Sequence, residues 1–144
     1  MERTEKAREL FSKGYYCSQA VLGAFAEEYG MEESQALKVS ACFGGGMCKA
    51  EVCGACAGAL MVLGLKYGMH KSGDYARQKE ADARASAFLD EFSARNGSYL
   101  CRELLGCDIS TEEGRERARS EKLFAEKCPE LVGSAVRILE EMFR

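Results

Sequence analysis

The sequence predicts an all-α fold, a single compact helical bundle of about six to seven helices over residues 1–144 with a buried apolar helix at its centre. Its 144 residues are 47% hydrophobic, which is enough for one domain with its own core. The chain contains one proline, and the alternation of apolar and polar residues that marks strands is almost absent. Apolar residues instead recur at intervals of three and four. We find no internal repeat and no linker.

The helices expected in the first half of the chain span residues 4–13, 17–29, 33–42 and 53–67. Gly14 ends the first of them, and Gly30 ends the second in the left-handed conformation that glycine accepts. The fourth helix is apolar on nearly every side. A helix with no polar face belongs in the middle of a bundle, so we expect this one at the centre.

The helices expected in the second half span residues 74–96, 110–125 and the segment from Cys128 to the end, with a short turn of helix over residues 99–105. The longest has the spacing of an amphipathic surface helix, with core positions at Ala81, Ala85, Phe88, Leu89 and Phe92. Ser110 and Glu113 form a capping box that opens the next helix. Pro129 occupies the favoured first position of the last one.

The distribution of charge excludes several classes of partner. Twenty basic and 23 acidic residues give a net charge of −3, with both signs mixed along the chain. No basic stripe is present, so neither nucleic acid nor an anionic membrane is expected as a partner. The charged N-terminal residues lack the apolar core of a secretory signal peptide, and the longest apolar run is too short to span a bilayer. We therefore expect a cytoplasmic protein, where eight cysteines favour metal binding, catalysis or redox sensing over structural disulfides.

Four of the eight cysteines lie within fifteen residues, on a glycine-rich segment: Cys42, Cys48, Cys53 and Cys56. The last three have the C-x4-C-x2-C spacing of plant-type iron–sulfur ferredoxins, although those proteins are β-rich. Cys53 and Cys56 also form a C-x-x-C pair, which makes them the candidate catalytic dithiol. A zinc site is a third interpretation, but no second C-x-x-C pair supports it.

Three cysteines lie at or just before a predicted helix start, namely Cys17, Cys53 and Cys128. Unpaired backbone N–H groups stabilise a thiolate there, so we expect lowered thiol pKa values at these positions. Cys42 and Cys107 are equally well explained as small hydrophobic residues of the core. The only histidine, His70, is expected on the surface.

The sequence resembles a family of redox-active proteins named for the pattern C-GCAxxG-C-C. The segment Cys53-Gly54-Ala55-Cys56-Ala57-Gly58 fits the C-G-A-x-x-G motif of that family. The resemblance extends from Gly-Tyr-Tyr-Cys17-Ser-Gln through Phe-Gly-Gly-Gly-Met to Cys101-Arg-Glu-Leu-Leu-Gly and Glu-Lys-Cys128-Pro. It implies that the four defining cysteines are Cys17, Cys53, Cys101 and Cys128, that the chemistry is redox, and that a membrane transporter is a partner to consider.

We expect the fold to bring these four sulfur atoms into one pocket. The favoured interpretation is an iron–sulfur cluster for electron transfer or redox sensing, with candidate ligands Cys17, Cys53, Cys101, Cys128, Cys48, Cys56, Cys42 and Cys107. Gly54, Ala55 and Gly58 are the candidate cofactor-binding residues beside it. The alternatives are a thiol–disulfide oxidoreductase using Cys53 with Cys56 or another cysteine, and a zinc-stabilised adaptor for a transporter. A redox protein or a small thiol would be the partner, and the chain could form a homodimer.

Overall fold

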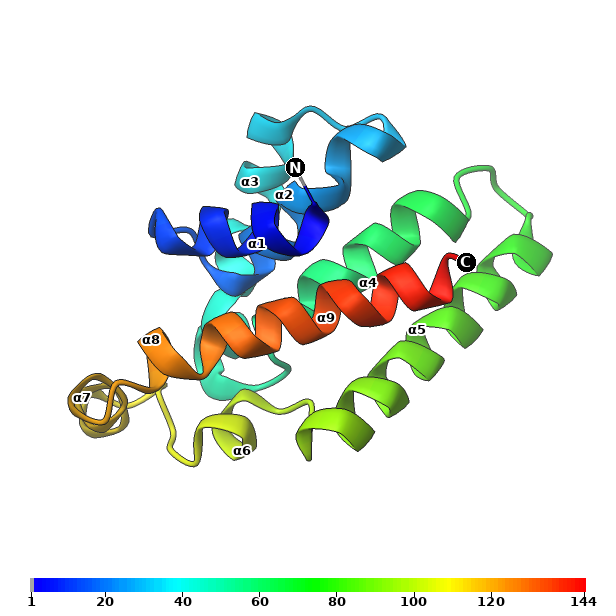
Figure 1. Ribbon diagram of the computed structural model, residues 1–144. Coiled ribbons are helices and arrows are strands. Elements are labelled where there is room, and N and C mark those ends of the chain that lie inside the picture. The colour runs from blue at the N-terminus through cyan, green and yellow to red at the C-terminus, as the bar shows by residue number, and fades with distance from the viewer. Residues whose placement is uncertain (1) are drawn as a thin grey trace.

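The computed structural model describes residues 2–144, and it confirms the all-α prediction, since this range contains no strand (Figure 1). The longer helices are α1 (Arg3–Ser12), α2 (Cys17–Phe25), α3 (Glu33–Val39), α4 (Gly54–Tyr67), α5 (Tyr75–Asn96), α7 (Glu112–Ser120) and α9 (Cys128–Met142). The shorter segments are α6 (Cys101–Leu105), α8 (Leu123–Glu126), η1 (Ala26–Tyr29), η2 (Ala41–Phe43) and η3 (Gly46–Ala50). The set of longer helices agrees with the six to seven expected.

The apolar helix α4 lies at the centre, as its sequence predicts. It packs against α2, α5 and α9. Its residues Ala55, Cys56, Ala59 and Val62 are fully buried. Gly58 allows a close approach of the two backbones, because a Cβ built on it would lie 2.6 Å from the backbone oxygen of Ser18 in α2. The small residues of α4 therefore set how near α2 can come.

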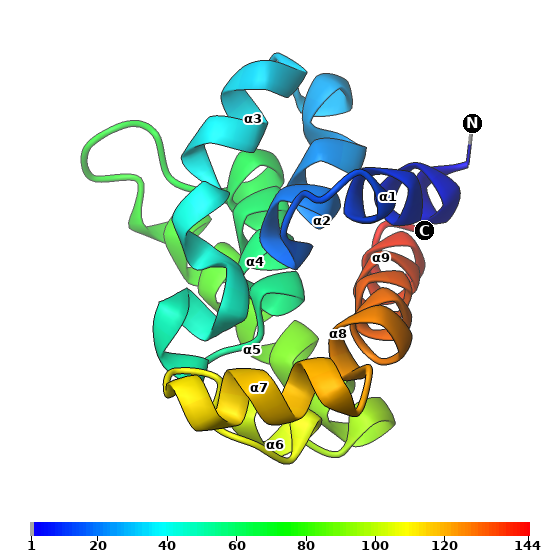
Figure 2. The same ribbon diagram turned by 90° about the vertical axis from the view of Figure 1, so that its left-hand side faces the viewer.

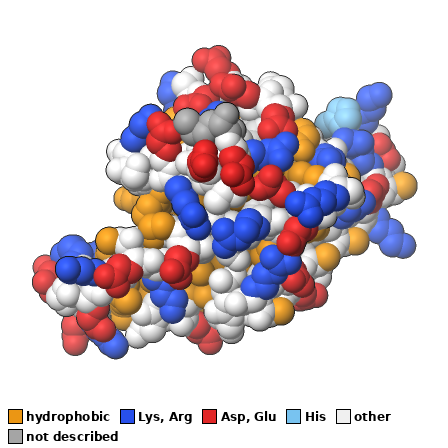
Figure 3. All heavy atoms as spheres, viewed as in Figure 1, with side chains coloured by type: hydrophobic (Ala, Val, Ile, Leu, Met, Phe, Trp, Pro, Cys, Tyr) orange, Lys and Arg blue, Asp and Glu red, His pale blue; other side chains and the backbone are white. Residues whose placement is uncertain are grey.

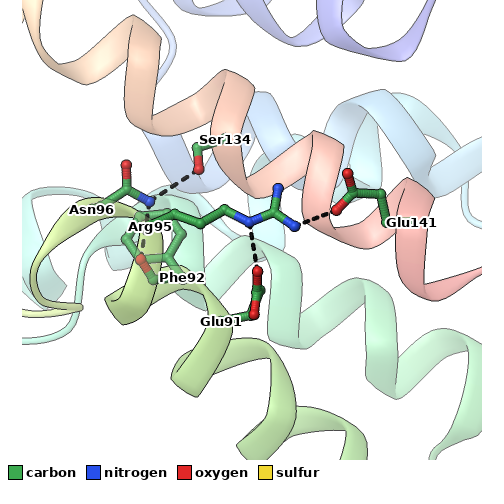
Figure 4. A network of polar contacts seen from close by, with 6 residues as sticks. All are labelled: Glu91, Phe92, Arg95, Asn96, Ser134 and Glu141. Atoms are coloured by element: carbon green, nitrogen blue, oxygen red, sulfur yellow. Dashed lines mark hydrogen bonds and ion pairs between the residues drawn. The ribbon is translucent and has the colours of Figure 1, made fainter.

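The C-terminal end of α5 is fastened to α9 by a polar network (Figure 4). The side-chain amide of Asn96 donates to the Ser134 hydroxyl at 3.0 Å and to the Phe92 carbonyl at 3.0 Å. Arg95 pairs with Glu91 at 2.7 Å and also with Glu141 of α9. On the same helix the rings of Phe88 and Phe92 are fully buried. The predicted core face of α5 is thus confirmed at its two largest residues.

Several helix boundaries differ from the prediction. The helix expected over 17–29 tightens into η1 after Phe25, and the helix expected over 33–42 ends at Val39. The helix expected over 110–125 divides into α7 and α8 because Lys122 adopts a left-handed conformation, with φ of 59°. Its N-cap is Thr111, whose hydroxyl accepts the Gly114 N–H at 3.0 Å, and the predicted cap at Ser110 is wrong.

The surface carries both signs of charge, as the composition predicts. On the face shown in Figure 3, lysine and arginine alternate with aspartate and glutamate, and hydrophobic side chains reach the surface between α1 and α8. Within residues 2–144 no helix combines the length and the apolar character that crossing a bilayer requires.

Candidate functional site

Four cysteines lie at the N-terminal ends of four different helices. Cys17, Cys101 and Cys128 are the first residues of α2, α6 and α9, and Cys53 is the N-cap of α4. The predicted placement of Cys17, Cys53 and Cys128 at helix starts is therefore correct. Since the first N–H groups of a helix have no partner within it, each of these thiols lies beside backbone donors and the positive end of a helix dipole.

Backbone hydrogen bonds hold Cys53 and Cys101 side by side, although 48 positions separate them in the sequence. The N–H of Cys53 donates to the carbonyl of Tyr99 at 2.8 Å, and the N–H of Cys101 donates to the carbonyl of Glu51 at 2.6 Å. This pairing is a short antiparallel contact between two connecting segments. It places the start of α6 next to the start of α4.

Gly54 brings Cys17 against the start of α4. A Cβ built on Gly54 would lie 2.3 Å from Cys17 Sγ, so the sulfur occupies the space that any other side chain would need. The Cys17 thiol there shares a side-chain hydrogen bond with the Cys53 thiol. The glycine that follows Cys53 is thus what allows the two sulfur atoms to meet.

The segment before α4 follows a left-handed path. The φ angles of Gly45, Gly46, Met47 and Cys48 are 63°, 64°, 59° and 63°. For a residue with a side chain this conformation costs about 1–2 kcal/mol, so Met47 and Cys48 are strained. Such strain persists where the surrounding structure enforces it, and often lies at functional sites. Here it places Cys48 at the rim of the cavity described next.

One cavity of about 600 Å³ receives these sulfur-bearing segments. Five cysteines line it: Cys17, Cys48, Cys53, Cys101 and Cys128. The remaining wall is mostly apolar. It comes from the end of α1 and the loop after it, from α6, α7 and α8, from the segment between α6 and α7, and from the first turn of α9. Figure 2 views the molecule from this end, with α7 and α8 near the viewer and the starts of α2 and α9 behind them. The fold therefore brings the four sequence-distant thiols to one cavity.

Burial raises the thiol pKa values, and the low values expected at helix starts are wrong. The hydrogen bond with Cys53, together with burial, raises the pKa of Cys17 well above 9.0, although the N–H groups of Gly45 and Ser18 act against this. The same hydrogen bond lowers the pKa of Cys53, but a hydrogen bond with Cys56 and burial outweigh it and raise that pKa overall. Burial removes water from the thiolate, which a few backbone donors do not replace.

Burial also raises the pKa of Cys101 and of Cys128, each to about 12. Neighbouring thiols add to the effect, since Cys17 raises the pKa of both and Cys128 raises that of Cys101. All four thiols therefore keep their protons at neutral pH. A reaction that uses them must remove protons together with electrons.

We expect the folded protein to lose stability as the pH rises from 9 towards 12. In that range the unfolded chain releases the protons of Cys101 and Cys128, while the folded chain retains them up to a pKa of about 12. The folded state then binds more protons, so the free energy of unfolding falls with pH, by up to about 1.4 kcal/mol per unit for each thiol. Urea unfolding at several pH values under reducing conditions measures this fall in the free energy of unfolding. Cys128→Ala should show a shallower decline, and an identical decline would contradict the assignment.

Residues 15–142 match a known protein family. That span fits the model of the family described as "Putative redox-active protein (C_GCAxxG_C_C)". The chain belongs to this family. No curated protein and no solved structure matches it. The resemblance identified from the sequence motifs is confirmed over this span. The four cysteines that the resemblance implies as defining, Cys17, Cys53, Cys101 and Cys128, all line the cavity.

The cysteines outside the family set have different surroundings. Cys56 is fully buried in the main core, where it contacts Cys53, and it does not line the cavity. Cys107 is buried in a smaller cluster with Cys101, whereas Cys42 is exposed. Cys48 alone among them faces the cavity. All eight are free thiols.

The candidate cofactor-binding residues of the C-G-A-x-x-G motif act mainly in packing. Gly54 lines the cavity beneath Cys17, while Ala55 and Gly58 are buried away from it. Within residues 2–144 no three His, Cys, Asp or Glu side chains converge in a way that could hold a metal ion. The iron–sulfur cluster and the zinc ion therefore stay predictions.

The rest of the cavity wall was not predicted from the sequence. Tyr15, Tyr16, Phe124 and Arg115 all line the cavity. Tyr15 and Tyr16 directly precede Cys17, so their position in the chain was a usable signal. Arg115 belongs to a charged helix that has the appearance of a solvated surface, and nothing in its sequence indicates the cavity.

Proposed function

We propose that this protein is a thiol–disulfide oxidoreductase in which Cys17 and Cys53 form the reversible dithiol pair. The observation that carries the proposal is the position of Cys17 Sγ at the wall of the cavity, directly over Gly54 and beside the thiol of Cys53. Thiols in contact can join with little movement of the backbone, and the cavity gives an acceptor access to both.

The chemistry of the pair balances with a disulfide as the acceptor. Cys53 gives up its proton and its thiolate attacks one sulfur of the acceptor. The other sulfur leaves as a thiolate, takes up that proton and becomes a thiol. Cys17 then attacks the mixed disulfide, which releases the second thiol and joins Cys17 to Cys53. The two thiols lose two electrons and two protons, and the acceptor gains both. Cys17 supports the first step because its hydrogen bond favours the thiolate of Cys53.

The raised thiol pKa values favour a strongly reducing pair. A low pKa stabilises the reduced form of a dithiol and makes it an oxidant, so thiols that keep their protons have the opposite tendency. We therefore expect a midpoint potential at or below that of thioredoxin, about −270 mV. Such a pair suits a reducing compartment, in keeping with the cytoplasmic location predicted from the sequence.

The iron–sulfur cluster remains a prediction that metal analysis can test. The density of cysteines favours it, while the lack of converging ligands among the described residues makes it the weaker candidate. A zinc-stabilised adaptor for a membrane transporter has the same weakness. Iron or zinc bound in stoichiometric amount to protein purified without oxygen would favour these alternatives over the dithiol.

The test uses hydroxyethyl disulfide, a small uncharged acceptor, with fully reduced protein in the absence of oxygen. We expect the loss of two thiols per chain and, after proteolysis, a peptide pair joined through Cys17 and Cys53 in the mass spectrum. A disulfide between other cysteines, or eight thiols that all stay reduced, would reject the proposed pair.

A further inference from the structure

We propose that the cavity binds a small, apolar, planar molecule of the quinone class, and that this molecule is the electron acceptor of Cys17 and Cys53. This inference rests on the proposed function and adds the substrate class. The size of the cavity, the nature of its wall and the distribution of charge around it carry the argument.

The size and wall of the cavity suit a ring-shaped ligand. Its volume of about 600 Å³ lies within the range of sites for small molecules, roughly 300–1,000 Å³. Four aromatic side chains contribute to the wall: Phe11, Tyr15, Tyr16 and Phe124. Aliphatic side chains complete it: Leu104, Leu105, Ile109 and Leu131. Aromatic rings pack well against a flat ring, by stacking or edge-to-face contact.

The charge around the cavity excludes strongly ionic acceptors. Among the described lining residues, Arg115 is the single charged side chain, and it donates one hydrogen bond to the carbonyl of Ile109 at 3.2 Å. Glutathione disulfide carries several carboxylates and ammonium groups, and most of them would lose water here without gaining a partner. A neutral quinone needs only donors for its carbonyl oxygens, and the remaining N–H groups of Arg115 can supply one.

The protonated state of the thiols fits the same acceptor. Oxidation of Cys17 and Cys53 breaks two S–H bonds and forms one S–S bond, which releases two electrons and two protons. A quinone takes up both pairs when its two carbonyl oxygens become hydroxyls. The exchange leaves no net charge in the apolar cavity, so neither side of the reaction incurs the cost of burying an ion.

Binding can be tested with a tryptophan reporter, since the chain contains no tryptophan. Phe124→Trp places one in the cavity wall, and Tyr75→Trp places one at the exposed start of α5 as the matched control. Both proteins are first oxidised with hydroxyethyl disulfide and then titrated with duroquinone, whose fully substituted ring resists thiol addition. We expect saturable loss of emission at one molecule per chain for Phe124→Trp, and only weak, linear quenching for Tyr75→Trp.

Electron transfer is then measured with reduced wild-type protein and duroquinone in the absence of oxygen. We expect one hydroquinone for each Cys17–Cys53 disulfide formed. Linear quenching in both reporters, or saturable binding without hydroquinone, would overturn the quinone assignment. Oxidation by hydroxyethyl disulfide is independent of these readings. If it still joins Cys17 to Cys53 while duroquinone fails, the substrate class is wrong and the dithiol pair stands.

Discussion

Cys17→Ser and Cys53→Ser should each abolish the oxidation of a thiol pair by a small disulfide. Each variant removes one of the two sulfur atoms that share a hydrogen bond at the cavity wall. The expected result is no disulfide within the chain. In Cys17→Ser a mixed disulfide should accumulate on Cys53, because the second step of the exchange has lost its nucleophile. Mass spectrometry of the intact protein distinguishes this adduct from unreacted protein.

Cys56→Ala is the control, because it tests the C-x-x-C pair that the sequence suggests. Cys56 contacts Cys53 but lies in the core and does not line the cavity, so the disulfide between Cys17 and Cys53 should still form. The hydrogen bond with Cys56 raises the pKa of Cys53, so its removal should also speed the reaction of Cys53 at neutral pH. Loss of oxidation in Cys56→Ala would instead identify Cys53 and Cys56 as the working pair.

The fold could be predicted because the periodicity of apolar residues is strong and local. The apolar surface of residues 53–67 indicated the central position of α4, and Gly30 was recognisable as a left-handed helix end. The break at Lys122 could not be predicted, because lysine gives no local signal for a positive φ. On either side of it, Ala118 of α7 and Leu123 and Phe124 of α8 pack in one small hydrophobic cluster.

The site was only partly visible in the sequence. The placement of Cys17, Cys53 and Cys128 at helix starts followed from helix boundaries, which depend on nearby residues. The direction of their pKa shifts depends on burial, which arises from distant segments and is absent from any local pattern. The left-handed conformation of Met47 and Cys48 could not be predicted either, because neither residue favours a positive φ.

Two glycines of the C-G-A-x-x-G motif, Gly54 and Gly58, control how closely α2 packs on α4. Gly54 and Gly58 are four residues apart, so they lie on the same face of α4. Gly54 makes room for Cys17 Sγ and Gly58 for the backbone of Ser18, the next residue of α2. Together they let the start of α2 lie directly on α4. The position of Cys17 beside Cys53 therefore depends on the contact between these two helices.

Gly58→Ala should destabilise the protein by about 1–3 kcal/mol, the usual cost of overpacking. The added Cβ would lie 2.6 Å from the Ser18 carbonyl oxygen and 3.1 Å from Val21 Cβ, and a backbone atom cannot rotate away as a flexible side chain can. Gly64→Ala is the matched control, because Gly64 lies on the same helix, is exposed, and has no atom within 4 Å of the added Cβ. That change should stabilise the protein by up to about 1 kcal/mol through helix propensity alone. Urea unfolding of both variants measures the difference, and a gain of stability in Gly58→Ala would mean that α2 and α4 are not in contact at this position.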